Sequence, residues 1–325
     1  MLTYIVRRTL QAIPLLLLIS VLLFLVAMKS SPAGPLTPYL TNPHITAADI
    51  ARLRHNFGLD KPIWVQYLFW LNQTLHGNLG YSTSNAEAVT TAILQRLPAT
   101  LELMGASLLI AITAGISLGI FSAVRPYSTA DYIITTFAFF GQSMPVFWFA
   151  LMMQLLFAVH GIPLPFGYEI QLPSAGMSSG GGFNLGDRID HLILPAFVLS
   201  LLQLALFSRF MRSSMLEVMK ADYMRTAAAK GLPFRTILFR HGFKNALIPV
   251  VTVIALSMPS LIGGAIVTET IFAWPGMGRL FINGLQQSDI PLLMGYLNLS
   301  AILVVFFNLI ADVTYAWLDP RVKFD

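Results

Sequence analysis

Few residues in this sequence of 325 have the types and spacings that catalysis or metal binding requires. No two of the six histidines stand three or four positions apart, the spacing that places two imidazoles on one helix face for a metal ion. The chain has no cysteine and therefore no disulfide and no iron–sulfur ligand. It also lacks a glycine-rich phosphate loop that ends in Lys-Ser or Lys-Thr. We expect no metal and no cofactor to bind to this chain.

The carboxylates next to apolar stretches are the second place where chemistry could occur. Glu102 and Glu269 stand at the ends of such stretches on one side, and Asp312 stands near the end of the last one. No charge lies near the middle of a stretch, whereas ion-coupled carriers usually need one at depth. An ion-driven secondary transporter, a channel and a membrane enzyme are therefore disfavoured alternatives. Glu269 could form a helix-end salt bridge or lie near an outer gate, and Asp312 should pair with a cytoplasmic-side base.

The composition identifies the environment of these residues. Charged residues make up 11% of the chain and mean hydropathy is +0.70, whereas soluble proteins carry about 25% charged residues. A bilayer core needs roughly 20 apolar residues in a helix. Uncharged runs of about this length are Thr9–Met28, Leu103–Val124, Tyr132–Val159, Leu192–Ser208, Asn245–Thr268 and Ile290–Ala311. We therefore predict an all-α, polytopic membrane protein with six transmembrane helices.

Three low-charge segments need separate interpretation. The apolar part of the first loop, Ile63–Leu71, is too short to span, and its Trp64, Tyr67 and Trp70 are typical of an interfacial helix. Ile170–Gly186 is glycine-rich and is predicted to be a loop. A cleaved signal peptide is the alternative for the first run, but that run exceeds the usual 7–15 residues and no small-x-small site follows, which favours an uncleaved helix.

The basic residues indicate orientation, because short cytoplasmic loops are rich in Lys and Arg. Bases on one side are Arg7, Arg8, Arg125, Arg209, Arg212, Lys220, Arg225, Lys230, Arg235, Arg240, Lys244, Arg321 and Lys323, against Arg188 and Arg279 in the short loops opposite. Both termini and the loop 209–244 should therefore be cytoplasmic. The formal charge of +5 is then an orientation signal, and no nucleic-acid partner is predicted. The predicted domains are 1–28, the tail and first helix; 29–98, an external loop domain; and 99–325, a five-helix core.

The fifth run contains several helix-perturbing residues. Pro259 is followed by the pair Gly263–Gly264, and membrane helices tolerate such residues as an ordinary matter. Their density in one span favours a bent or broken helix that lines a path. Candidates for the path or its gate are Ser257, Met258, Pro259, Gly263, Gly264 and Glu269.

The cytoplasmic loop 209–244 carries the most informative pattern. Met211, Met215, Val218 and Met219 fall on one helical stripe. An alanine-rich segment then ends at Gly231, a suitable C-terminal cap, and Pro233 suits the start of another helix. The loop could simply touch anionic lipid. The alternative is a docking element, since small side chains let a partner approach closely.

At this point the residues resemble a known family. Asp222-Tyr223-Met224-Arg225-Thr226-Ala227-Ala228-Ala229-Lys230-Gly231-Leu232-Pro233, with Asn245-Ala246-Leu247-Ile248-Pro249 beyond it, is similar to the EAA loop of bacterial ABC-importer permeases of the dipeptide/oligopeptide family. Further matches in the family's order are Arg7-Arg8, Phe57-Gly58-Leu59-Asp60-Lys61-Pro62, Gly77-Asn78-Leu79-Gly80, Arg96-Leu97-Pro98-Ala99-Thr100-Leu101-Glu102, Thr268-Glu269-Thr270-Ile271-Phe272, Pro275-Gly276-Met277-Gly278 and Leu318-Asp319-Pro320-Arg321. The general pattern begins with Glu where this chain has Arg225, a departure usual in the peptide subfamily.

The resemblance implies a type I ABC-importer permease fold in a bacterial inner membrane. It implies a second, non-identical permease, two ATP-binding subunits that use ATP and Mg, and an external binding protein that delivers a peptide. The chain itself would be a non-catalytic subunit within the lipid bilayer. The implied ATPase-coupling residues are Arg225, Thr226, Ala227, Ala228, Ala229, Lys230 and Gly231. Nickel, glutathione or a sugar is the alternative ligand.

Overall fold

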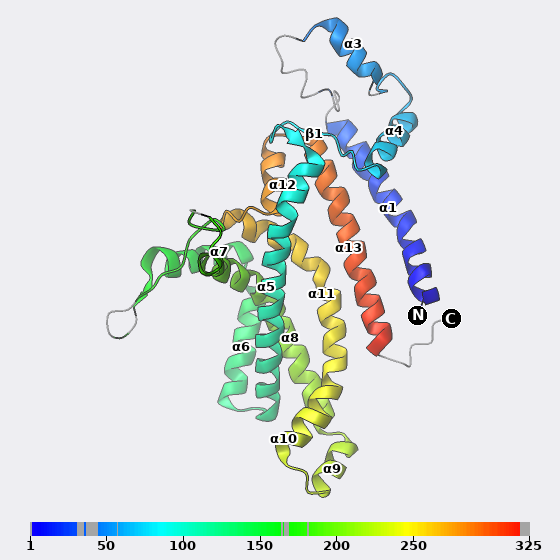
Figure 1. The fold of residues 1–325 in the computed structure, drawn as a ribbon. Coiled ribbons are helices and arrows are strands. Elements are labelled where there is room, and N and C mark those ends of the chain that lie inside the picture. Colours follow the sequence, from blue (N-terminus) through cyan, green and yellow to red (C-terminus); the bar gives the residue numbers. More distant parts are fainter. Residues whose placement is uncertain are drawn as a thin grey trace.

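The computed structural model describes residues 2–30, 36, 45–56, 58–163, 165, 169–180 and 182–318. Long helices form a bundle with smaller elements at both ends (Figure 1). The long helices are α1 (Leu2–Ser30), α5 (Val89–Val124), α8 (Leu185–Met219), α11 (Lys244–Ile271) and α13 (Ile290–Leu318). The shorter ones are α3 (Ala47–Asn56), α4 (Ile63–Leu75), α6 (Thr129–Ser143), α7 (Val146–Gln154), α9 (Asp222–Ala229), α10 (Phe234–Thr236) and α12 (Met277–Gln286). Two π-helical segments are η2 (Leu155–His160) and η4 (Ile237–Phe243).

Two small antiparallel hairpins, which the sequence pattern did not predict, accompany the helices. Strand β1 (Tyr81–Ser82) pairs with β2 (Glu87–Ala88), and β3 (Ile162–Pro163) pairs with β4 (Glu169–Ile170). The segment between β4 and α8 has no helix or strand in its described residues, as predicted for Ile170–Gly186, except that α8 begins at Leu185. Helix α5 begins at Val89, inside the predicted range 29–98.

The predicted membrane spans are largely confirmed. Within the described part of the chain, five helices are long and apolar enough to cross a bilayer: Val6–Lys29, Val89–Val124, Leu185–Met219, Phe234–Gly263 and Ile290–Thr314. A sixth span exists only if the bent pair Thr129–Ser143 and Val146–His160 counts as one.

The third predicted span, Tyr132–Val159, is not a single straight helix. It breaks between Ser143 and Val146, and the helix direction bends by 108° there. The cause is Pro145, which has no N–H and forces the preceding Met144 into an extended conformation (φ −81°, ψ 130°). In Figure 1, α6 runs alongside α5 while α7 leaves the bundle sideways.

Helix α8 forms the centre of the bundle. Glycines on α5 allow it to approach closely, because a Cβ on Gly119 would lie only 2.6 Å from Met211 Cβ and from Ser208 O. Met211 and Met215 are fully buried in the largest core cluster, which confirms the predicted methionine stripe. Any movement of α8 must therefore involve α5.

The two ends of the described chain lie on the same side of the bundle. Arg8 of α1 donates to Asp312 of α13 over 2.5 Å, which confirms that Asp312 pairs with a base. An even number of crossings agrees with this arrangement. The predicted basic tail, with Arg321 and Lys323, lies outside the described residues.

Helix α4, which was predicted to be interfacial, packs against the C-terminal half of α1. Tyr67 and Trp70 both place their rings 5.6 Å from the ring of Phe24, and the Tyr67 hydroxyl lies 2.9 Å from Ser20 Oγ. Trp64 is 64% exposed. Two of the three predicted interfacial aromatics therefore contact α1, and one is free to meet lipid or a partner.

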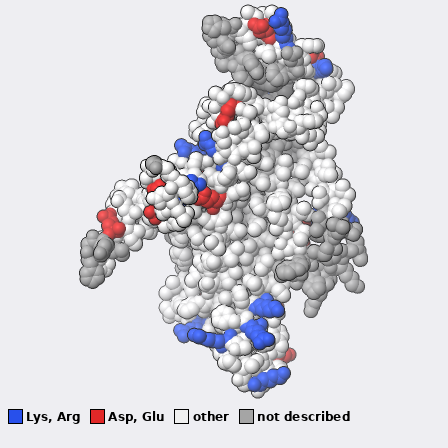
Figure 2. Space-filling model, viewed as in Figure 1, with Lys and Arg blue, Asp and Glu red and all other residues white. Residues whose placement is uncertain are grey.

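Charged side chains gather at the ends of the molecule. Figure 2 shows that Lys and Arg dominate the end formed by α9 and α10, and that a largely uncharged belt separates this end from the charged side chains near α7. This distribution is what a bilayer around the bundle requires.

Candidate coupling and translocation sites

Helix α9 forms a hairpin with α10 at the basic end of the bundle (Figure 1). Its apolar face holds Met224 and Ala227, which are 4% and 6% exposed and pack with Ile237 of η4. Ala227 was expected in a docking surface, but its burial places it inside the hairpin. The remaining predicted coupling residues are all exposed: Arg225, Thr226, Ala228, Ala229, Lys230 and Gly231.

Gly231 ends α9 as predicted. Its φ of +75° is the left-handed conformation that favours glycine, and its N–H donates to Ala228 O at 3.0 Å. A Cβ on Gly231 would meet nothing within 4 Å, so the position is constrained by the backbone angle and not by space. Pro233 then precedes α10, and its carbonyl accepts hydrogen bonds from the N–H groups of Thr236 in α10 and Ile237 in η4.

The hairpin continues into two long helices without a flexible loop. Helix α8 extends past its predicted end at Ser208 to Met219, and α10, η4 and α11 follow one another directly from Phe234 to Ile271. Most of the predicted loop 209–244 is therefore helical. A displacement of α9 would be transmitted directly to α8 and α11.

A buried ion pair joins α6 to α8 near this end. Arg212 Nε and Nη2 donate to the two carboxylate oxygens of Asp131 at 2.7 and 2.6 Å. Ser122 also donates to Asp131, which is only 2% exposed, and the Tyr127 N–H donates to its other oxygen at 2.8 Å. Sequence analysis missed this pair. The sequence offered one indication of it: Asp131 stands at the start of an apolar run, and Arg212 in loop 209–244 had no assigned partner.

Glu269 is a second buried carboxylate, at the end of the bundle opposite to Asp131. The side chain is fully buried, and it accepts hydrogen bonds from the N–H groups of Gly278 and Arg279 (2.7 and 3.1 Å) and from the Thr100 hydroxyl (2.7 Å). Thr100 Oγ1 in turn accepts the N–H of Met277 at 2.8 Å. The expected helix-end salt bridge of Glu269 is wrong, since no base within the described residues pairs with it. Its carboxylate instead caps the N-terminus of α12 and ties α5, α11 and α12 together.

The fifth span is not broken, because α11 continues through both Pro249 and Pro259. Of the predicted path residues, Ser257 is buried with its hydroxyl donating to Ile254 O at 2.8 Å, Met258 and Pro259 are partly buried, and Gly263 is exposed. Gly264 lies within α11. The break that was expected here occurs at Pro145 in the third span.

Helix α11 has an exposed stripe that sequence analysis missed. From Leu256 onward its members recur every three or four positions: Leu256, Ser260, Gly263, Val267 and Thr270. Asn245, Ile248 and Pro249 are exposed nearer the start of the helix. Ser260 also accepts a hydrogen bond from Gln203 of α8 at 3.1 Å. The spacing of Ser260, Gly263 and Thr270 in a membrane span was the signal that could have revealed this face.

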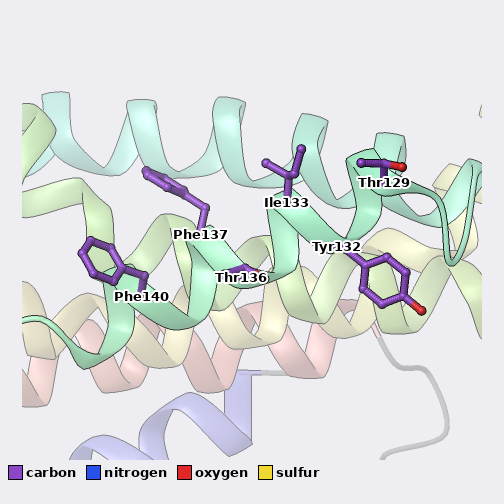
Figure 3. A pocket seen from close by; sticks show the side chains of 6 residues that line it. All are labelled: Thr129, Tyr132, Ile133, Thr136, Phe137 and Phe140. Atoms are coloured by element: carbon purple, nitrogen blue, oxygen red, sulfur yellow. The ribbon is translucent and has the colours of Figure 1, made fainter.

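An open groove of about 490 Å³ runs along α6. Figure 3 shows that all six lining side chains come from this one helix: Thr129, Tyr132, Ile133, Thr136, Phe137 and Phe140. A groove on a single helix is a contact face and not an enclosed ligand site. Nowhere in the described residues do three His, Asp or Glu side chains gather as metal ligands.

Comparison with known proteins places this architecture. The family model "Binding-protein-dependent transport system inner membrane component" matches residues 115–324, and its N-terminal companion model matches residues 1–104. The chain belongs to this family. This member is accordingly a multi-pass protein of the inner membrane.

Relatives of this family member align over almost their whole length. The Oligopeptide transport system permease protein AppB of Bacillus subtilis is 44% identical over 100% of both chains, and the Dipeptide transport system permease protein DppB of Escherichia coli K12 is 37% identical over 99% of both. A solved structure described as an amino acid ABC transporter with histidines matches with a TM-score of 0.51 and 11% identity, over 70% of this chain and 94% of that one. The structural likeness shows the fold alone.

Proposed function

We propose that this chain is the permease subunit of an ATP-driven importer that moves peptides inward after an external binding protein delivers them. The observation that carries this function is the α9 hairpin, which is continuous with two membrane helices and presents small exposed residues at the basic end. The peptide ligand is supported by the names of the relatives, which are oligopeptide and dipeptide permeases.

The ATPase subunits would dock on the exposed face of α9. Ala228, Ala229 and Gly231 let a partner surface come close, and Arg225 and Lys230 flank them with polar groups. The chain is proposed to be non-catalytic, with ATP and Mg used by two partner ATPases. A second permease, a non-identical homologue, would complete the channel.

The path would follow the exposed stripe of α11. Ser260 and Thr270 supply hydroxyls along it, and Gly263 leaves space. Among the predicted gate residues, Ser257 and Glu269 are buried and would position α11 without lining the path. Closure of the ATPases would move α9, and α8 and α11 would then swing between inward-open and outward-open states.

The coupling role is tested with Ala228→Asp in the full importer reconstituted into vesicles. The new carboxylate would be buried in the contact with the ATPase without a partner, which weakens docking. Each 1.4 kcal/mol of lost docking free energy is a factor of ten in affinity, so ATP-dependent peptide uptake should fall at least about tenfold. Ala228→Ser is the matched control and should transport normally. Normal uptake by the aspartate variant, inserted at wild-type level, would overturn the proposed coupling surface.

The ligand class is tested separately. Mass spectrometry of the purified cognate binding protein should find bound peptides. Finding nickel, glutathione or a sugar instead would keep the importer class and replace the ligand.

A further inference from the structure

Arg209 is a charged residue of the bundle for which the described residues supply no hydrogen-bonding partner. It lies in α8, inside the membrane-spanning helix Leu185–Met219, and its side chain is partly buried. Its Nε is buried without a hydrogen-bond acceptor, and the described residues offer the guanidinium neither an ion pair nor a hydrogen bond. A buried donor without a partner needs an explanation, and an arginine inside a membrane span is costly.

The other arginines of the same helix show what is missing. Arg188 binds Glu102 through two nitrogens at 2.8 and 2.5 Å, and Arg212 binds Asp131 in the same two-pronged way. Both pairs satisfy a planar guanidinium with a planar carboxylate. Arg209 stands three positions from Arg212 yet pairs with no carboxylate among the described residues, so the two Nη groups of its guanidinium remain available.

A ring, and not an acid, holds Arg209 in place. Its Cζ lies 5.0 Å from the centre of the Phe139 ring on α6. Stacking of this kind stabilises a guanidinium while leaving the N–H groups at its edge able to donate in the plane. The charge is therefore oriented between α6 and α8 without being neutralised.

Arg209 lies on the open side of α8. Leu202 and Ser213, seven positions before and four after Arg209, lie on the same helical stripe and are exposed. Phe139 also stands eight positions beyond Asp131 along α6, about 12 Å deeper from the basic end at 1.5 Å per residue. Arg209 thus lies farther from the basic end of the bundle than the ion pair of Arg212 with Asp131.

We propose that Arg209 binds the C-terminal carboxylate of the peptide as it passes through the membrane. This inference rests on the proposed peptide transport. Every linear peptide carries this carboxylate whatever its side chains, so one arginine can serve many sequences. A fork held by an aromatic ring binds a carboxylate bidentately, and partial exposure keeps the binding weak enough for release.

The experiment compares uptake of trialanine with uptake of its C-terminal amide by the complete importer in vesicles. The binding protein has its own preference for a free carboxylate, but that preference is the same for every permease variant. The acid-to-amide ratio of a variant, divided by the wild-type ratio, therefore reports the permease alone. For Arg209→Gln this quotient should fall about tenfold, the loss expected for one charged hydrogen bond.

Further variants keep the test decisive. Arg209→Lys retains the charge without the planar fork and should lower the quotient about threefold. This variant still tests the proposal if Arg209→Gln does not assemble. Arg212→Gln, a matched control on the same helix, should lower acid and amide uptake by the same factor. Unchanged uptake by Arg209→Gln, or an equal fall for both peptides, would overturn the proposal and indicate a lipid, second-permease or structural contact. Absence of uptake of both peptides by wild-type importer would instead overturn the peptide function itself.

Discussion

Buried carboxylates at the two ends of the bundle are satisfied in different ways. At the end that carries α12, Glu269 and Asp289 accept, among the described residues, only from backbone N–H groups and hydroxyls: Asp289 binds the Ser82 hydroxyl at 2.7 Å, the N–H and hydroxyl of Ser84 at 2.9 and 2.8 Å, and the Leu292 N–H at 3.2 Å. At the end that carries α9, Asp131 is satisfied mainly by the side chain of Arg212.

The difference teaches which end can move. Backbone donors in the first turn of a helix are fixed, and the helix dipole adds to their attraction for a carboxylate. The contacts of Glu269 therefore hold α5, α11 and α12 in one arrangement. A long arginine side chain can follow a shifting helix, and the small apolar contact under α9 resists displacement little. We infer that the end that carries α12 is a fixed frame and that the end that carries α9 is the movable one.

The largest expected effect comes from removing the external carboxylate. Glu269→Ala leaves two backbone N–H groups and one hydroxyl without an acceptor inside the protein. At about 1–3 kcal/mol each, the free energy of unfolding should fall by about 4 kcal/mol. Thermal unfolding in detergent measures this, with Glu269→Gln as the control that keeps one carbonyl acceptor. Equal stability of the two variants would contradict the capping role.

The buried ion pair should have the next largest effect. Arg212→Met strands the Asp131 carboxylate and should cost about 3 kcal/mol. The double variant Arg212→Met with Asp131→Leu should recover most of that loss, because apolar replacement of both partners removes the unpaired charge. A double variant that is no better than the single one would mean that the pair is not the source of the loss.

A backbone change at the hairpin should have a smaller effect on stability. Gly231→Ala places an L side chain in the left-handed region at a cost of about 1 kcal/mol, with no steric conflict. The strain should tilt α9, so peptide uptake per ATP should fall more than stability does. Gly231→Asn is the control, because asparagine tolerates this conformation better. An equal fall in peptide uptake per ATP for Gly231→Ala and Gly231→Asn would contradict a role for the left-handed backbone at this position.

The smallest effect is expected on the exposed face of α9. Arg225 is 77% exposed in its side chain and lies 3.7 Å from the exposed Asp222. Exposed pairs of this kind contribute little, so Arg225→Gln should change the free energy of unfolding by less than about 0.5 kcal/mol. Chemical denaturation checks this. A larger loss would show that the outer face of α9 is part of the fold and not a free docking surface.

Sequence patterns revealed the elements whose physical cause is local. Uncharged length located the spans, the methionine stripe located the buried face of α8, and Gly231 marked the end of α9. The patterns failed where contacts between distant segments decide. The partners of Glu269 stand at positions 100, 278 and 279, and Asp131 meets an arginine from another helix. The predicted position of the helix break was wrong for a related reason, because neighbouring segments decide whether a helix tolerates a proline. Helix α11 continues through two prolines, whereas Pro145 breaks the third span.

The unbroken helical run from Phe234 to Ile271 has a mechanical consequence. At roughly 1.5 Å per residue it is a rod of about 55 Å, with the hairpin at one end and the contacts of Glu269 at the other. Because the contacts of Glu269 hold one end, the rod turns about that end and the hairpin moves the farthest. A tilt of a few degrees there becomes a displacement of several ångströms at the hairpin, so the hairpin can be repositioned by a small change of angle between α11 and the helices packed on it.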